Sequence, residues 1–188
     1  LNVIGGGLSS GELGVGELVL DYAGSTISLK RGGLVAFTIA LNGQSQRSLV
    51  DNLLAAFRGL DITPELDRAP IDDETPFVID PDTAADYAKL CDWVFTVMAR
   101  FRARLNGPQT PLVVWPHHFD FSFIWFATPD MDEHKAPHMN FGFAPESAGF
   151  DRPYFYMYAW PMPEGLTEQP IPAPAYWNTD GFSGMVID

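Results

Sequence analysis

The pattern of side chains changes after Gly107, and this change most constrains the fold. Of the 25 aromatic residues in the chain, 17 lie beyond this glycine, together with 12 of the 16 prolines. Short aromatic and β-branched runs alternate there with proline-rich turns and show no helical period. Strands joined without helices do not form right-handed parallel crossovers, so we expect an antiparallel sheet. The candidate strands in this aromatic β section, residues 111–188, are LVVWPHHFDFSFIWF, HMNFGFA, YFYMYAW and GFSGMVI.

Residues 17–60 predict a strand meander followed by a helix. The runs ELVLDY, TISLKR and LVAFTIAL are β-branched and apolar, and short glycine-containing segments separate them, as in antiparallel strands. A helical period then begins after Ser45, a candidate N-cap, and stops at Gly59. We expect this helix to cover one face of the meander.

A second, longer helix is predicted over residues 81–106. Asp80 is a candidate N-cap, Pro81 is suited to the first helical position, and an apolar stripe runs along one side of the helix. Cys91 lies in this stripe, which favours a packing role over a reactive thiol. The acidic, proline-punctuated segment between the two helices predicts an irregular connector.

The start of the chain is rich in glycine. Six of the first sixteen residues are glycine, which predicts a flexible lead-in over residues 1–16 because each glycine loses much backbone entropy on ordering. We therefore expect one α+β domain over residues 17–188, in which antiparallel sheets with aromatic-rich C-terminal strands pack against two amphipathic helices. Since the chain begins with Leu1 rather than methionine, we also expect residues upstream of it.

Charge and composition exclude several classes of protein. The formal net charge of −13 repels phosphate backbones, so we expect no nucleic-acid partner. No apolar run approaches the length of a membrane span, and no signal peptide is visible, so we expect no membrane partner. Cys91 is the single cysteine, which favours a reducing compartment and hence the cytoplasm.

The HHFD motif within the first aromatic run predicts a polar site. In an extended chain His118 and Asp120 face one way, while His117 faces the other way with the phenylalanines and is interpreted as structural. Asp120 can orient an imidazole for proton transfer, so Asp120 and His118 are the candidate catalytic residues. The two histidines act as a pair only if the strand breaks at Pro116.

A metal site requires at least one further ligand, and the nearest source is the strand HMNFGF. Pairing of this strand with the first would bring His138 and Asn140 within reach of His118 and Asp120. The candidate metal ligands are therefore His118, Asp120 and His138, and the nitrogen and oxygen donors suit zinc, iron or manganese. The alternative interpretation is that backbone and tyrosine hydrogen bonds satisfy these side chains.

The run YFYMYAW predicts a face of tyrosines. Tyr156, Tyr158 and Trp160 alternate with apolar residues, and Tyr176 and Trp177 further along the chain are expected to cap the same surface. Each buried hydroxyl needs a hydrogen-bond partner, so such a face is typical of a pocket or an interface, although core packing is the alternative. A small-molecule ligand or self-association is the expected use of this surface.

Five segments resemble a bacterial family of unknown function, domain-of-unknown-function family 5996. They are LVAFTIALNGQSQRSLVDNLLAAF, FRARLNG, VWPHHFDFSFIWF, HMNFGFAPESAGFDRPYFYMYAWPMPEGL and AYWNTDGFSGMVI. The resemblance implies no activity, cofactor or substrate. Members of the family usually carry an additional aromatic-rich segment before the first strands, where this chain has its glycine-rich start. Some members carry other residues at His117 and His118 but keep the Phe-Asp pair, which favours Asp120 as the functional residue.

Two functions from different classes follow from these patterns. The first is a module that binds a small ligand or a protein through an aromatic-lined surface. The alternative is a metal-dependent enzyme of the hydrolase or oxygenase type that uses His118, Asp120 and His138. Metal-free acid/base catalysis by Asp120 with a histidine is a third hypothesis.

Overall fold

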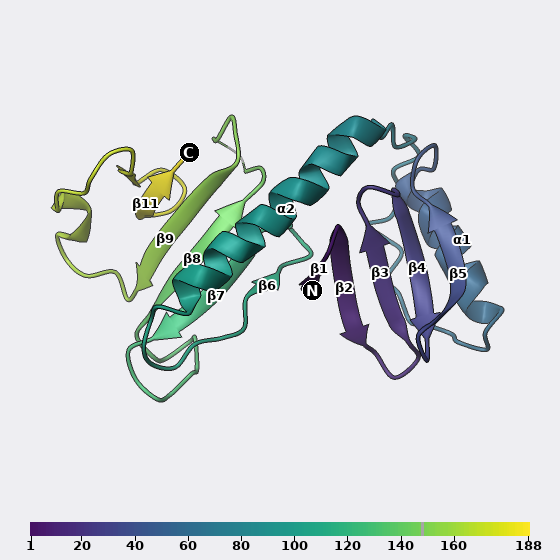
Figure 1. The fold of residues 1–188 in the computed structure, drawn as a ribbon, viewed down its shortest axis with the longest axis horizontal. Coiled ribbons are helices and arrows are strands. Elements are labelled where there is room, and N and C mark those ends of the chain that lie inside the picture. Colours follow the sequence, from purple (N-terminus) through teal and green to yellow (C-terminus); the bar gives the residue numbers. More distant parts are fainter. Residues whose placement is uncertain (148) are drawn as a thin grey trace. The chain divides into compact units, whose positions relative to one another are not determined.

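The computed structural model describes residues 1–147 and 149–188. They form two antiparallel sheets and two α-helices (Figure 1), so the predicted α+β class is confirmed. The chain divides into two compact units, Leu1–Trp93 and Val94–Asp188, which are called unit 1 and unit 2 below. The single domain over residues 17–188 stays a prediction.

Unit 1 contains a five-stranded antiparallel meander in the order β1-β2-β3-β4-β5 (Figure 1). Its strands are β1 (Asn2–Ile4), β2 (Gly7–Glu12), β3 (Glu17–Asp21), β4 (Thr26–Arg31) and β5 (Leu34–Ala40). The last three strands match the three runs predicted from residue 17 on. Leu8 in β2, Val19 in β3 and Leu29 in β4 are buried and supply apolar core residues of this unit.

The prediction of a flexible lead-in over residues 1–16 is wrong, because β1 and β2 form a hairpin there. The glycines of this hairpin allow a tight turn and a close approach of two strands. Gly6 lies in the two-residue turn with φ +78°, a conformation that side chains other than glycine rarely adopt. Gly7 faces the backbone of β3, and a Cβ at this position would collide with the carbonyl oxygen of Leu20. Glycine density therefore marks close packing here.

Helix α1 (Gln46–Arg58) begins at the predicted cap. The Ser45 hydroxyl accepts a hydrogen bond from the Ser48 backbone N–H at 3.2 Å, and the Ser48 hydroxyl accepts one from the Ser45 N–H at 2.9 Å. This capping box satisfies two of the N–H groups that a helix start leaves without partners. The helix contacts β5, where Phe57 meets Phe37 edge to face with ring centroids 5.4 Å apart.

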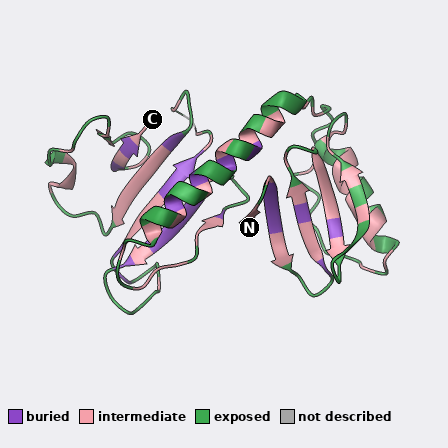
Figure 2. Cartoon of the chain, in the orientation of Figure 1, coloured by how far each residue is buried: buried purple, intermediate pink, exposed green. Residues whose placement is uncertain are grey.

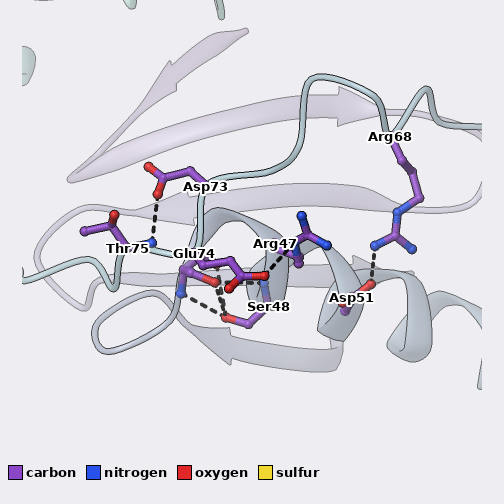
Figure 3. A network of polar contacts seen from close by, with 8 residues as sticks. Arg47, Ser48, Asp51, Arg68, Asp73, Glu74 and Thr75 are labelled. Atoms are coloured by element: carbon purple, nitrogen blue, oxygen red, sulfur yellow. Dashed lines mark hydrogen bonds and ion pairs between the residues drawn. The ribbon is translucent and has the colours of Figure 1, made fainter.

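The connector after α1 has no helix or strand, as predicted, and it is tied to the start of that helix (Figure 3). Arg47 forms an ion pair with Glu74 at 3.3 Å, and Asp51 pairs with Arg68. These pairs are exposed, so each contributes little to the free energy of unfolding. Backbone hydrogen bonds in both directions between Phe77 and the turn before α1 hold the connector in place.

Helix α2 (Pro81–Arg102) spans the boundary between the units. The Asp80 carboxylate accepts a hydrogen bond from the Thr83 N–H at 2.7 Å, which confirms the predicted N-cap, and the helix ends a few residues before the predicted end at 106. Cys91 is buried in the predicted stripe.

No helix in residues 1–147 or 149–188 has the length and apolar character needed to span a bilayer.

Unit 2 contains a six-stranded antiparallel sheet in the order β10-β11-β9-β8-β7-β6. Figure 1 labels β11, β9, β8, β7 and β6 of this sheet. Its strands are β6 (Val113–Val114), β7 (Phe121–Phe126), β8 (His138–Ala144), β9 (Tyr154–Trp160), β10 (Tyr176–Asn178) and β11 (Gly184–Ile187), and a short 3-10 helix, η1, covers Leu166–Glu168. Hydrogen bonds run between neighbouring strands throughout, so the predicted antiparallel pairing is confirmed.

One face of this sheet packs against the C-terminal part of α2. The Phe101 ring meets the Phe141 ring of β8 edge to face, with ring centroids 5.0 Å apart, and its centroid lies 6.2 Å from that of Phe123 in β7. Figure 2 shows the buried residues concentrated in β7 and β8, where Phe121, Phe123 and Phe126 are almost fully enclosed. The C-terminal part of α2 therefore lies against one face of this sheet, and the other face points away from the helix.

We predict that Ser45→Ala lowers the free energy of unfolding by about 1 kcal/mol, because the Ser48 N–H in the first turn of α1 loses its hydrogen-bond partner. Urea unfolding followed by circular dichroism measures this change. Ser183→Ala, at an exposed serine outside any helix, is the matched control and is expected to stay within about 0.5 kcal/mol of the parent. Equal effects of the two substitutions would contradict the capping assignment.

We predict that stability falls as the pH rises from 9 to 11, because of a buried cluster in unit 1. Burial raises the pKa of the Cys91 thiol from 9.0 to about 11 and also raises the pKa of Tyr22 and Tyr87. The unfolded chain releases these protons at lower pH than the folded chain, so stability present below pH 9 is lost above it, on the order of 2 kcal/mol for the thiol. Urea unfolding at stepped pH measures the loss.

The same cluster predicts low thiol reactivity. Cys91 should react with a disulfide reagent at pH 8 only after urea unfolding, since a buried thiol with a raised pKa carries little thiolate. Rapid labelling of the folded protein at pH 8, or stability that does not change up to pH 11, would show that the cluster is open to water.

Candidate functional site

The face of the unit 2 sheet opposite α2 carries the predicted row of tyrosines. In β9 Tyr154, Tyr156, Tyr158 and Trp160 alternate with residues of the opposite face, and the β8–β9 register pairs Tyr156 with Gly142, Tyr158 with Asn140 and Trp160 with His138. Residues paired across antiparallel strands share a face. We call this surface the tyrosine face, and it comprises Tyr154, Tyr156, Tyr158, Trp160, His138, Asn140 and Gly142.

The HHFD motif lies in a turn at the end of this face. The sequence predicted one continuous strand over 112–126, and this is wrong: the chain turns at Pro116–His118, so that β6 and β7 form a hairpin. The Trp115 N–H donates to the Asp120 carbonyl at 2.9 Å, and Phe119 has φ +56°. Proline has no N–H for a ladder of hydrogen bonds, so the break occurs at Pro116.

The turn brings the two histidines together, contrary to the prediction of opposed faces. The rings of His117 and His118 are 4.7 Å apart between centroids, and both side chains are exposed. The ring centroid of His117 also lies 6.2 Å from that of Trp115. The interpretation of His117 as a structural residue among the phenylalanines is therefore wrong, because strand alternation does not extend through a turn.

Asp120 and Tyr156 form the central polar contact of the site. The Tyr156 hydroxyl donates to the Asp120 Oδ2 at 2.6 Å. Burial raises the pKa of Tyr156, and the neighbouring Asp120 carboxylate raises it further, so the phenol stays protonated and acts as the donor. The Tyr156 ring lies over Gly142, where a Cβ would collide with it. The glycine therefore seats the ring that reaches Asp120.

Further hydrogen bonds hold the neighbouring side chains. The Asn140 Nδ2 donates to the Tyr158 hydroxyl at 2.8 Å, and the Trp115 Nε1 donates to the Ser122 Oγ at 2.8 Å. The rings of Tyr156 and Tyr158 lie nearly parallel, with an 8° angle and 6.3 Å between centroids. These bonds orient the side chains before any ligand arrives, which lowers the entropy cost of binding.

Two adjoining cavities open on the tyrosine face, of about 310 and 410 Å³. The Asp120 cavity is lined by His117, His118, Asp120, Ala144, Ser147, Tyr154, Tyr156, Tyr158 and Phe182. The His138 cavity is lined by Trp115, His117, Asp120, Ser122, Ile124, Glu133, His134, His138, Asn140, Tyr156, Tyr158 and Trp160. Both cavities include His117, Asp120, Tyr156 and Tyr158, so together they form one hollow along the face.

His138 lies far from His118 and Asp120. It pairs with Phe126, whereas Asp120 precedes Phe121 at the other end of β7, and six residues at about 3.3 Å each separate the two ends by roughly 20 Å. The expectation that strand pairing brings the three candidate ligands within reach is therefore wrong. In residues 1–147 and 149–188 no group of three or more His, Cys, Asp or Glu side chains is arranged to hold a metal ion.

His138 has structural partners of its own. Its Nδ1 lies 2.9 Å from the Ala136 carbonyl oxygen. Its ring stacks on the Trp160 ring, with 5.5 Å between ring centroids and 19° between ring planes. The side chain is buried at the edge of the His138 cavity. It therefore contributes a wall of that cavity. Its contact with a backbone carbonyl agrees with the alternative interpretation, in which backbone and tyrosine hydrogen bonds satisfy these side chains.

Trp177 does not join the tyrosine face. It pairs with Met185, which pairs with Met157, and these residues belong to the opposite face of the sheet. The Trp177 Nε1 donates to the Gln169 carbonyl at 2.7 Å. Of the four predicted binding residues, Tyr156, Tyr158 and Trp160 line the hollow and Trp177 does not.

Sequence reasoning missed several residues of the hollow. Phe182, in the loop before β11, forms part of the wall of the Asp120 cavity, and its ring centroid lies 6.2 Å from that of Tyr156. Ser147 also lines this cavity, while Trp115 and Ser122 line its neighbour. Loops and turns supply most of these residues, and strand periodicity carries no signal for them.

Comparison with known proteins gives one result. A family model described as a family of unknown function, DUF5996, matches residues 1–186, which confirms the resemblance found in the sequence. No curated protein matches the chain. No solved structure matches it.

We predict that Gly142→Ala lowers the free energy of unfolding by roughly 1 to 3 kcal/mol, because the new methyl group displaces the Tyr156 ring and breaks its bond to Asp120. Urea unfolding measures the loss. Gly5→Ala is the matched control, since it has open space around its Cβ and ordinary backbone geometry.

A double-mutant cycle isolates the cause. In a Tyr156→Leu background the ring is absent, so Gly142→Ala should cost much less than in the parent chain. An equal cost in both backgrounds would mean that the glycine serves the backbone of β8 and does not seat the tyrosine.

Proposed function

Because the chain belongs to the family of unknown function DUF5996, we propose its function from the site alone: unit 2 binds a small organic molecule in the hollow of the tyrosine face. The observation that supports this proposal is the pair of adjoining cavities that share His117, Asp120, Tyr156 and Tyr158. Each cavity falls in the volume range of small-molecule sites.

The lining has the composition of a binding site. Aromatic rings supply apolar area, and a few polar groups at set positions fix the orientation of a ligand. Trp160 is 41% exposed and Trp115 also 41%, so each can cover more apolar surface when a ligand is present. Their burial would provide favourable free energy in proportion to the area removed from water.

The polar groups divide along the hollow. Asp120, His117 and His118 lie at the end formed by the β6–β7 turn, and Asn140 lies further along. The Asn140 Oδ1 is buried and has no hydrogen-bond partner among the described residues, whereas its Nδ2 is bound to Tyr158. We assign a recognition role to Asp120 and to the histidines, and ring stacking to Tyr156, Tyr158 and Trp160.

The metal-dependent enzyme is not proposed. It requires His118, Asp120 and His138 to converge, and the strand register separates His138 from the other two by the length of β7. No observation on this face favours acid/base catalysis over binding, so the binding module is the function that the geometry supports best.

A screen tests the proposal. Aromatic, amine, polyol and carboxylate compounds are screened by thermal shift, and each compound that stabilises the protein is titrated directly. Tyr158→Leu should weaken binding about tenfold or more, since truncation of a central aromatic side chain removes a large part of the contact energy. Tyr176→Leu is the matched control, because Tyr176 is partly exposed and lines neither cavity.

The outcome against the proposal is equally concrete. Compounds that bind Tyr158→Leu and the parent equally well would place binding elsewhere. Light scattering adds a second arm: a stable dimer that Tyr158→Leu dissociates, with no compound bound, would show that the tyrosine face is an interface between two copies of the chain.

A further inference from the structure

Asp120 is a partly buried carboxylate without a cationic partner. Its Oδ2 accepts the hydrogen bond from Tyr156, and among the described residues no group donates to its Oδ1 and no Lys or Arg lies within ion-pair distance. Arg152, in the loop before β9, pairs with Asp188 at 3.9 Å instead. A carboxylate removed from water is stabilised by a positive charge close to it.

Aromatic rings form much of the wall of the cavity around Asp120. Tyr154, Tyr156, Tyr158 and Phe182 all line the Asp120 cavity. Tyr156 and Tyr158 lie nearly parallel, while Phe182 stands at 69° to Tyr156, so the rings form two walls that meet at an angle. The face of an aromatic ring is electronegative, and several rings around one space attract a cation.

No Lys or Arg side chain of the described residues lines this space. Neither cavity is lined by Lys or Arg among the described residues, and the charged groups that do line them are Asp120 and Glu133. An anionic ligand would therefore meet a carboxylate with no compensating charge. A neutral ligand would bring no positive charge to Asp120.

We propose that the Asp120 cavity binds an organic ammonium group, with the cation against the Asp120 carboxylate and between the rings of Tyr156, Tyr158 and Phe182. This inference rests on the proposed function and names its ligand class. The ammonium group supplies the charge that Asp120 lacks, and its alkyl substituents fill the aromatic walls. The net charge of −13 further favours the approach of cations over anions.

The test uses three probes of nearly equal shape. Choline carries a quaternary ammonium, 3,3-dimethylbutan-1-ol replaces the charged nitrogen by carbon, and 3,3-dimethylbutanoate carries a negative charge. Affinities for the full chain are measured by ligand-observed NMR titration. Choline is expected to bind about tenfold tighter than the neutral alcohol, and the carboxylate is expected to bind weakest.

Two variants separate a local charge from the overall charge. Asp120→Asn keeps an acceptor for the Tyr156 hydroxyl and removes the negative charge, so it should lower choline affinity about tenfold and leave the affinity for the neutral alcohol unchanged. Unchanged alcohol binding also shows that the cavity of the variant is intact. Asp151→Asn changes net charge by the same amount at an exposed position outside the cavities and should leave all three affinities unchanged.

The results discriminate between the two proposals. If the neutral alcohol or the carboxylate binds as tightly as choline, or if Asp120→Asn and Asp151→Asn weaken choline equally, the ammonium assignment is overturned. Binding of any compound that depends on Tyr158 would still support the ligand site. If no compound of the screen binds in that way, both proposals fail.

Discussion

Side chains in β8 and β9 alternate between two faces, and the register between these strands places every central residue of the site. It pairs Tyr156 with Gly142 and Tyr158 with Asn140, so one tyrosine ring lies over a glycine and the next is bound by an amide. A shift of one residue would send the tyrosines to the face that packs on α2. The ring over Gly142 is also the one that reaches Asp120, so this register carries the polar contact of the site as well.

The turn between β6 and β7 supplies the other half of the site. Because the chain reverses at Pro116–His118, two histidines and an aspartate stand at one end of a row of rings on β9. The strands thus provide a rigid aromatic wall, and the turn provides polar groups at its end. This division is common in binding sites, where a scaffold holds the position and loops carry the recognition.

Asp120 is a carboxylate surrounded by aromatic rings, and these surroundings make the site selective for the charge of a ligand. Asp120 is bound on one oxygen by a protonated phenol, and the raised pKa of Tyr156 keeps that phenol from ionising. The Asp120 cavity therefore carries one negative charge that no described Lys or Arg neutralises. An ammonium group would complete the charge balance and would also fit the electronegative faces of the rings. In the part of the chain that the structure describes, no group of three or more His, Cys, Asp or Glu side chains around Asp120 is arranged to hold a metal ion.

The sequence by itself determined the elements whose signals are local. Short β-branched and aromatic runs predicted β3, β4, β5, β8 and β9, helical period and caps predicted α1 and α2, and the tyrosine row was visible in one strand. Only the tertiary structure decided what depends on contacts between distant segments. Glycines at the start proved to serve a hairpin and a close approach to β3, the HHFD motif proved to be a turn, and the register set His138 apart from Asp120. Alternation shows which face a residue occupies, but the distance along that face depends on how two strands slide past each other, and only their pairing determines that distance.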